Sequence, residues 1–311
     1  MSTADTTPDT TPGATLGAIP EAADDRTAVP LFASDLDRTL IYSAAALGLT
    51  MPDAEAPRLL CVETYESRPL SYMTETAAQL LTRLAGHCVF VPTTTRTREQ
   101  YGRVRLPGAP SRYAVCANGG HILVDGEPDP DWHAQVRRSL SVCAPLDEVC
   151  EHLRRAADGG DWVLKQRVAD ELFAYLVVDR GRLPDAWVKE LAEWAGACGW
   201  TVSLQGRKIY AVPGPLTKSA AVAEIARRTG ATHTYAAGDS LLDADMLLAA
   251  GHGWLPGHGE LADSGWRAGH ITALHERGVA AGERIVREMS AAAGADRAHA
   301  DRAGPDRAGP V

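Results

Sequence analysis

Two aspartates, Asp35 and Asp37, stand two residues apart where an apolar segment ends and the chain must turn. In the stretch ASDLDRTL (33–40) an extended backbone puts both carboxylates on one face. Such close like charges disfavour joint ionisation unless a cation, hydrogen-bond donors or water screens them. A carboxylate in this place can attack as a nucleophile or hold a metal, and a second one can act as general acid and base. The alternative is an ordinary solvated turn.

Three further groups of polar residues could do chemistry, each with a plainer alternative. The run TTTR (93–96) follows an apolar segment, where a hydroxyl can hold a phosphoryl oxygen or simply cap a helix. Lys218 precedes a helical pattern, where a lysine opposes the helix dipole unless an anion shares the place; otherwise it is a solvated surface residue. Asp239 and Asp243, in GDSLLD, either complement a helix dipole or join another carboxylate in an oxygen site suited to Mg²⁺.

The elements that must position these groups alternate along the chain. Between residues 29 and 290, short apolar runs bounded by Gly, Pro or Asp alternate with helical patterns, which predicts an α/β fold with a Rossmann-like, mostly parallel three-layer core. The runs 88–91, 113–117 and 234–237 each end in polar residues. Ligands of open α/β sheets bind outside the carboxyl ends of the strands, so we expect the site at that edge of the sheet.

The middle of the chain indicates a second domain. Residues 126–213 show the order αββαββ, which predicts a small α+β cap domain inserted into a core domain formed by 29–125 and 214–290. Both ends of the chain, 1–28 and 291–311, lack an apolar period. We expect them to be disordered tails.

Composition and charge narrow the range of partners. The 311 residues carry a formal net charge of −9, and there is no basic stripe with interleaved aromatics, so we expect no nucleic-acid partner. No run reaches the roughly 18 apolar residues of a membrane span, and the N-terminus lacks a signal-peptide pattern, so we expect a cytoplasmic protein without a membrane partner. The six cysteines form no C-x-x-C pair, which favours reduced, packed thiols.

Taken jointly, the four groups resemble a known family. An Asp pair, a Thr after a second strand, a Lys at a helix start and a G-D-S-x-x-D after a third strand, in this order, resemble the haloacid dehalogenase-like superfamily of phosphohydrolases. The inserted block resembles the α/β cap of the branch with Cof-like sugar phosphatases, sucrose-phosphate phosphatase, trehalose-phosphate phosphatase and eukaryotic-type phosphomannomutase. The resemblance covers about residues 29–290.

The resemblance implies a role for each group that handles phosphate. Asp35 is the nucleophile that forms an aspartyl-phosphate, and Asp37 protonates the leaving oxygen and then activates water. Thr94 and Lys218 bind the non-bridging phosphoryl oxygens. Thr95 stands where relatives usually have Gly, which leaves open whether Thr93 or Thr94 is the phosphate ligand.

The same resemblance implies a Mg²⁺ site. Its ligands are Asp35, the backbone carbonyl of Asp37 and Asp239. Asp243 is bound to the water shell of the metal or orients Lys218. The metal lets an anionic nucleophile approach an anionic phosphate.

Substrate contacts are expected from five residues. Lys165 and Arg167 share one face of an expected cap strand, where a solvated face is the alternative. Asn118 and Gly119 follow a core strand, and Arg96 follows the Thr run.

These expectations lead to a Mg²⁺-dependent phosphatase acting on a small phosphorylated metabolite, a sugar or polyol phosphate. The alternatives are a phosphomannomutase-like phosphomutase and a catalytically idle phosphate-binding protein. The sequence leaves the oligomeric state undetermined. It also assigns no role to residues 42–71.

Overall fold

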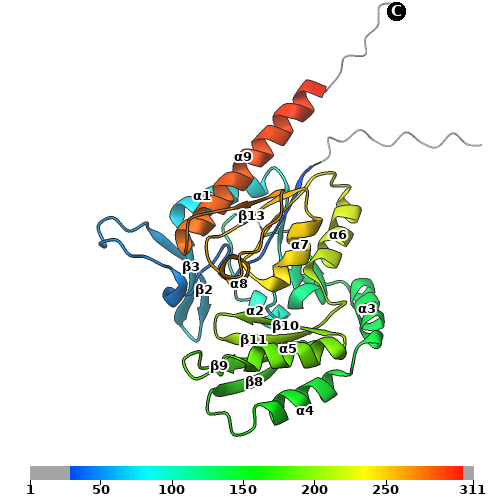
Figure 1. Ribbon diagram of the computed structural model, residues 1–311. Coiled ribbons are helices and arrows are strands. Elements are labelled where there is room, and N and C mark those ends of the chain that lie inside the picture. The colour runs from blue at the N-terminus through cyan, green and yellow to red at the C-terminus, as the bar shows by residue number, and fades with distance from the viewer. Residues whose placement is uncertain (1–28, 109, 304–311) are drawn as a thin grey trace, which may run out of the picture.

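A five-stranded parallel sheet forms the centre of the molecule, with strand order β14-β13-β12-β1-β4 (Figure 1). The computed structural model describes residues 29–108 and 110–303. The strands are β1 (Leu31–Ser34), β4 (Val89–Pro92), β12 (Thr234–Ala237), β13 (His252–Leu255) and β14 (Ile271–Ala273). The predicted α/β fold with a mostly parallel sheet is therefore confirmed.

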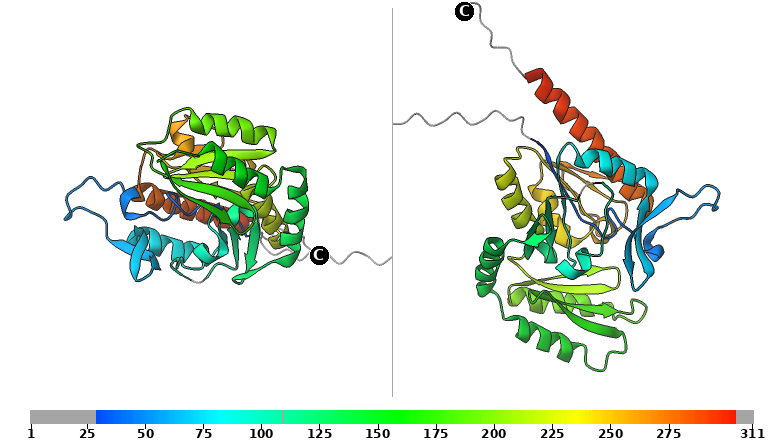
Figure 2. Two further views of the ribbon diagram at one scale, coloured as in Figure 1. Left: turned by 90° about the horizontal axis from the view of Figure 1, so that it is seen from below. Right: turned by 180° about the vertical axis from the view of Figure 1, so that it is seen from behind.

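Helices cover both faces of this sheet and make three layers (Figure 2). The helices on the two faces are α1 (Glu75–Ala85), α6 (Lys218–Thr229), α7 (Ala244–Ala249) and α9 (Val279–Ala303). Successive residues of β1 serve the two faces: Ala33 belongs to the apolar cluster of Val222, and Phe32 to that of Leu81 and Ile285. Consequently α6 and α7 pack on one face, and α1 and α9 on the other.

The C-terminal helix corrects one expectation. We expected a disordered tail from residue 291, but α9 continues to Ala303. Ile285, Met289 and Ala293 recur every four residues on its buried face, and the Tyr235 hydroxyl donates to the carboxylate of Asp296 at 3.0 Å. Alanine carries little apolar signal, so the sequence pattern does not show how far this helix extends. Residues 304–311 and the expected tail 1–28 lie outside the described residues.

Two smaller antiparallel sheets extend the core. The strands β5 (Tyr113–Cys116), β6 (His121–Val124) and β7 (Glu127–Pro128) form one, joined to the main sheet by a single parallel bridge between Thr93 and Val115. The segment without an assigned role contains a hairpin of β2 (Leu59–Tyr65) and β3 (Arg68–Thr74), which projects beside α1 in Figure 1.

The expected cap elements are present in the expected order. They are α4 (Leu146–Ala156), β8 (Val163–Ala169), β9 (Phe173–Val178), α5 (Trp187–Ala197), β10 (Trp200–Gln205) and β11 (Lys208–Pro213). The four strands form an antiparallel sheet in the order β10-β11-β9-β8. An additional helix, α3 (Pro130–Ser139), lies within the expected cap range but packs on the core, where the Trp132 indole donates to the Gly119 carbonyl at 2.8 Å. The division into two domains stays a prediction.

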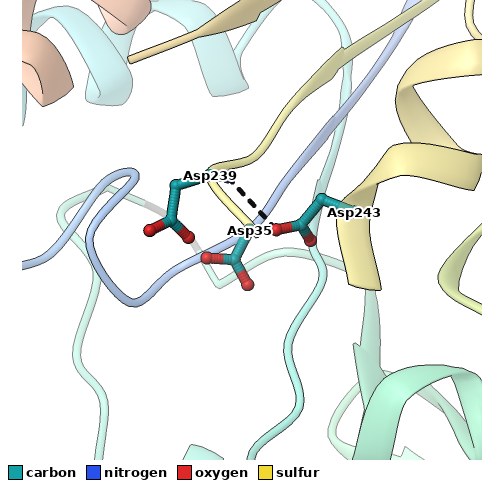
Figure 3. Close-up of side chains that lie close together, drawn as sticks. All are labelled: Asp35, Asp239 and Asp243. Atoms are coloured by element: carbon teal, nitrogen blue, oxygen red, sulfur yellow. Dashed lines mark hydrogen bonds between the residues drawn. The ribbon is translucent and has the colours of Figure 1, made fainter. Parts of the chain in front are cut away.

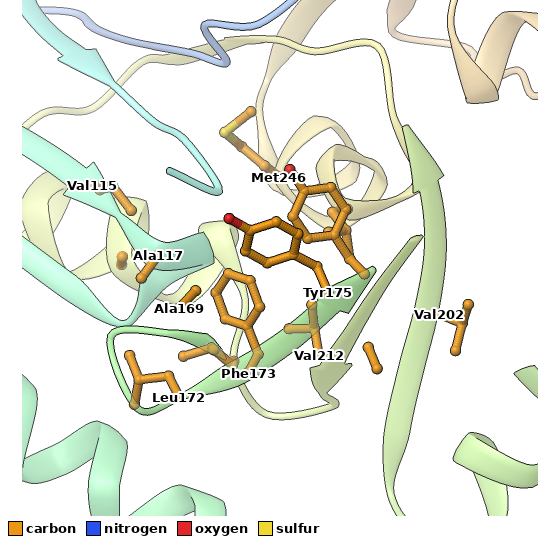
Figure 4. Packing of buried hydrophobic residues seen from close by; sticks show 14 of the residues in the cluster. Val115, Ala117, Ala169, Leu172, Phe173, Tyr175, Val202, Val212 and Met246 are labelled. Carbon is orange, nitrogen blue, oxygen red and sulfur yellow. The ribbon is translucent and has the colours of Figure 1, made fainter. Parts of the chain in front are cut away.

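The cap sheet packs directly against the core. One apolar cluster contains Val115 and Ala117 of the core together with Leu172 and Phe173 of the cap (Figure 4). Polar contacts add to it, because the Glu260 carboxylate of α8 (Glu260–Asp263) accepts from the Ser203 hydroxyl of β10 at 2.6 Å. Among the described residues no helix has both the length and the apolar character to cross a bilayer.

Candidate active site

Three aspartates from two strand ends lie together at the carboxyl edge of the main sheet (Figure 3). Asp35 follows β1 directly, and Asp239 and Asp243 follow the neighbouring strand β12. Carboxylate oxygens of the three lie within 4.8 Å of one another, and all three residues are buried. Parallel strands bring their carboxyl ends to one edge, so this grouping depends on the adjacency of β1 and β12.

Lys218 joins two of these carboxylates. It is the first residue of α6, it is fully buried, and its Nζ lies 2.6 Å from Asp35 Oδ1 and 2.5 Å from Asp243 Oδ1. Burial lowers the pKa of the ammonium, but the charges of Asp243 and Asp35 outweigh it and hold the pKa above its usual range. The lysine is therefore charged and fixed between the two carboxylates.

Asp243 acts as the anchor of the loop that carries Asp239. Its Oδ2 accepts from the Ser240 hydroxyl at 2.6 Å, the Ser240 N–H at 2.9 Å and the Asp239 N–H at 3.2 Å. At Gly238 a Cβ atom would lie 2.4 Å from the Asp243 Cβ, so only glycine allows this approach. Because both Asp243 oxygens are engaged, the contacts favour orientation of Lys218 over a place in a metal water shell.

The charges of the cluster are not balanced. Burial raises the pKa of Asp35 to about 7; Lys218 opposes the rise, and Asp243 and Asp37 add to it. Burial, Asp35 and Asp243 also raise the pKa of Asp239 well above its usual value, although the Arg38 Nε lies 3.2 Å from its Oδ2. When all three carboxyls are ionised they face two cations, which leaves one negative charge in excess.

The free oxygens of this cluster fit a divalent cation. None of the hydrogen bonds between described residues uses Asp35 Oδ2 or Asp239 Oδ1. Mg²⁺ prefers oxygen ligands and is commonly held by one or two carboxylates together with a substrate phosphate and water. Asp35 and Asp239 could therefore hold it, and its charge would offset the excess.

Asp37 does not belong to this cluster and pairs with Arg96. The guanidinium donates to both carboxylate oxygens, with Nε 2.7 Å from Oδ2 and Nη2 2.8 Å from Oδ1, while Nη1 lies 2.9 Å from Oε2 of the buried Glu63. Enclosure raises the pKa of Asp37, but the charge and hydrogen bonds of Arg96 outweigh this and hold it below its usual value. Arg96, expected to contact substrate, thus contacts Asp37 in this structure.

The hydrogen bonds of the Thr run bear on the choice between Thr93 and Thr94. The Thr93 hydroxyl donates to the Val91 carbonyl at 3.1 Å, whereas Thr94 Oγ1 accepts from the Arg96 N–H at 3.2 Å. Only the Thr94 hydroxyl therefore keeps its proton for a ligand. These contacts favour Thr94, as expected.

Asn118 and Gly119 brace the turn before Lys218. The Asn118 amide donates to the Leu216 carbonyl at 2.8 Å, and a Cβ atom on Gly119 would lie 2.0 Å from the Thr217 carbonyl oxygen. Their contacts position α6, and neither residue lines the cavity beside Asp239.

Lys165 and Arg167 lie on the same face of β8, as expected, but β8 is the edge strand of the cap sheet and both side chains are exposed. Neither residue lines the cavity beside Asp239. That cavity measures about 520 Å³ and lies between core and cap, with Arg38, Arg180 and Glu260 among its lining residues.

Residues that the sequence analysis did not single out hold the stretch 33–40, which carries Asp35 and Asp37, in place. The ring of the buried His258 has its Nε2 2.8 Å from the Arg38 carbonyl oxygen, and its Nδ1 accepts from the Gly278 N–H at 3.2 Å. Arg38 itself has a positive φ of 65° and pairs with Asp239. No local signal identifies these partners, since His258 is 220 residues from Arg38.

Comparisons with known proteins bear on the fold. No protein-family model and no curated protein matches the chain. Solved structures do, and the sucrose-phosphatase of Synechocystis sp. PCC6803, in complex with sucrose and phosphate, has a TM-score of 0.53 at 15% identity, over 83% of this chain and 97% of that chain. The chain has the haloacid dehalogenase-like fold.

A second solved structure of this fold is Thermoplasma acidophilum 0175, with a TM-score of 0.55 at 11% identity, over 84% of this chain and 98% of that chain. Both alignments include the cap as well as the core, since the 83% and 84% of this chain that they cover exceed what the core alone could supply. The resemblance drawn from the motifs is confirmed for the haloacid dehalogenase-like fold. The roles of individual residues stay predictions.

Proposed function

We propose that the chain is a Mg²⁺-dependent phosphatase that hydrolyses a small phosphorylated metabolite, a sugar or polyol phosphate, through an aspartyl-phosphate. The observation that carries this proposal is the buried arrangement of Asp35, Lys218 and Asp243 beside Asp239. Burying four charged groups lowers the stability of the fold, so such a cluster is expected where it serves a function. The fold shared with a sucrose-phosphatase supports the reaction and the substrate class.

In the proposed reaction, Asp35 attacks phosphorus in line with the leaving oxygen and the P–O bond to the alcohol breaks. Asp37 gives a proton to the departing alcohol. It then takes one from the water that cleaves the acyl phosphate and restores the Asp35 carboxylate. Lys218 and the Thr94 hydroxyl bind the non-bridging oxygens and stabilise their charge in the transition state. A phosphate dianion bound beside Asp37 opposes Arg96 and raises the pKa of Asp37 toward that of a general acid.

Asp35, Asp239 and the backbone carbonyl of Asp37 are the proposed Mg²⁺ ligands. When bound, the metal neutralises charge between nucleophile and phosphate. We assign Asp243 the role of orienting Lys218.

The test is release of inorganic phosphate from a panel of sugar, polyol and nucleoside monophosphates, with Mg²⁺ and with a chelator. Metal-dependent release from members of the panel would support the proposal. Conversion of a sugar monophosphate into its isomer, primed by a bisphosphate, would assign the chain to the mutases. Tight phosphate binding without turnover of any substrate would indicate an idle binding protein.

Stabilisation by Mg²⁺ is expected to depend strongly on pH. The pKa of Asp35 is raised to about 7 in the metal-free fold, so its contribution to stability is present below about pH 4 and lost as the pH rises through about 7. Ligation needs the ionised carboxylate, so Mg²⁺ affinity falls about tenfold per pH unit below 7. The increase in Tm at one Mg²⁺ concentration should be large at pH 8 and small at pH 5. NaCl at matched ionic strength is the control, and equal increases at both pH values would contradict the assignment.

Glu63→Gln is expected to affect substrates according to their leaving groups. Without the Glu63 charge, Arg96 loses one of its two anionic partners and holds Asp37 less firmly. We expect kcat/KM for an alkyl phosphate to fall about tenfold, because its alcohol must be protonated as it leaves. For p-nitrophenyl phosphate, whose phenolate leaves without a proton, kcat/KM should fall much less.

The matched control is Glu66→Gln in the exposed turn of the same hairpin, which should change kcat/KM for neither substrate. An equal loss for both substrates in Glu63→Gln would show that Glu63 only supports the fold.

A further inference from the structure

We propose that the cap carries a cationic subsite, Lys208 beside Tyr175 and Tyr210, that binds a carboxylate or phosphate group on the alcohol part of the substrate. The inference rests on the proposed function and narrows its substrate class to phosphomonoesters with a second anionic group. It adds a cap residue to Lys165 and Arg167, whose contacts with substrate stay predictions.

The subsite lies on the face of the cap sheet that covers the core. Lys208 and Tyr210 are two residues apart on β11, so their side chains share one face of the sheet. Tyr210 pairs with Tyr175 of β9. Figure 4 shows Tyr175 projecting from the sheet on the same side as Phe173. The Tyr210 hydroxyl is 3.5 Å from Thr95 Oγ1, next to the proposed phosphate ligand Thr94. This face of the cap therefore adjoins the reacting phosphate.

Lys208 is placed on the side of the leaving group. Its Nζ lies 5.5 Å from the ring centre of Tyr175 and 5.9 Å from that of Tyr210, within the range of cation–π attraction. Asp37 lies near enough that its charge and that of Lys208 influence each other. Asp37 is the proposed proton donor to the leaving oxygen, so the alcohol must lie between Asp37 and the cap.

The charge of Lys208 has no carboxylate partner in this position. Within residues 29–108 and 110–303, no carboxylate oxygen lies within 4.0 Å of its Nζ. The pKa of the Lys208 ammonium is raised to about 12. Tyr210 and Asp37 raise this pKa, and partial burial opposes them. Asp37 already receives two hydrogen bonds from Arg96, so it does not need this second cation.

A partly buried ammonium between aromatic rings can bind an anion more firmly than a neutral hydroxyl, because a charge-assisted hydrogen bond is stronger and the rings exclude water. A substrate whose alcohol carries a carboxylate or phosphate would supply that anion. A neutral alcohol would leave the ammonium without its partner.

The experiment compares the binding of matched ligands that differ in one anionic group. The first pair is 3-phosphoglycerate and glycerol 3-phosphate, and the second is fructose 1,6-bisphosphate and fructose 1-phosphate. Kd values are measured in the Asp35→Asn background, where turnover does not interfere. In one pair, we expect the ligand with the second anionic group to bind about 10- to 100-fold more tightly than the ligand without it. The pair that shows the preference identifies carboxylate or phosphate as the group bound.

Variants assign the preference to Lys208. Lys208→Met should bring the ratio of the two Kd values close to one, and Lys208→Arg, which keeps the charge, should retain a preference. Lys189→Met, on the exposed surface of α5, is the control that should keep the full ratio. Should Lys208→Met fail to fold, Lys208→Gln takes its place. No preference in either pair, or a preference that survives Lys208→Met, would overturn the inference.

Failure of the subsite and failure of the proposed function can be told apart. Turnover of p-nitrophenyl phosphate by the unmodified chain tests the phosphatase reaction without any anionic leaving group. Turnover without an anion preference would remove only the subsite. A Lys208-dependent preference without turnover would retain the subsite and remove the phosphatase.

Discussion

Asp35→Asn is expected to abolish phosphate release, lowering kcat by about 10⁴-fold or more. The substitution keeps the shape of the side chain but removes the oxygen anion proposed to attack phosphorus. Asp239, Asp243 and Lys218 remain in place to bind phosphate. The measurement is steady-state phosphate release with Mg²⁺, on whichever substrate of the panel the unmodified chain turns over fastest.

The loss should not come from unfolding. Asp35 shares Lys218 with Asp243 in a cluster with one excess negative charge, and burial raises its pKa to about 7. The amide removes that excess, so we expect the Tm of the metal-free variant at pH 8 to be at least that of the unmodified chain. Asp185→Asn, at an exposed cap position, is the matched control for activity. Residual turnover within about tenfold of the unmodified chain would rule out Asp35 as the nucleophile.

Lys218→Met is expected to cost both stability and activity. The methionine fills a similar volume but leaves the carboxylates of Asp35 and Asp243 buried without the ammonium between them. Removing one partner of a buried ion pair typically costs about 3–5 kcal/mol. Loss of a phosphoryl-binding charge should also lower kcat about 10²- to 10³-fold. The free energy of unfolding is measured by urea denaturation of the metal-free protein.

The pH dependence separates this effect from a packing defect. Lys218 opposes the rise in the pKa of Asp35. Without Lys218 this pKa rises further in the folded state, so stability is retained where the carboxyl is protonated and lost as the pH rises toward 8. The destabilisation should therefore be smaller at pH 5 than at pH 8. Lys189→Met, which removes an exposed lysine 4.0 Å from Glu193, should change stability little at either pH. A cost independent of pH would indicate that Lys218 contributes packing alone.

Local patterns in the sequence predicted the core of the fold and its edge of strand ends. The helix α1, for example, has local end signals, since the Thr74 hydroxyl caps its start and Gly86 its end. The apolar runs that lead to Asp35, Thr94 and Asp239 are the adjacent strands β1, β4 and β12. These features depend on residues close in sequence, which is why periodicity and capping residues were enough.

Pairing between distant segments was not predictable in this way. The sequence did not predict that Arg96 lies between Asp37 and Glu63, since Glu63 comes from a hairpin for which the sequence suggested no role. His258 and Arg38 meet across 220 residues. Such contacts depend on strand order and on how the hairpin packs, and neither leaves a periodic signal along the chain.

The cap shows where sequence and tertiary structure divide the information. The alternation of β8 correctly predicted that Lys165 and Arg167 share a face, because side-chain direction alternates along any strand. Which strand of the sheet lies over the site depends on the order β10-β11-β9-β8, which puts β8 at the exposed edge and Lys208 of β11 in the middle, near Asp37. The sequence by itself therefore determined which residues could do the chemistry and on which elements they lie. Only the packing of cap on core decided which of them meet, because strand order and domain contact are set by long-range burial.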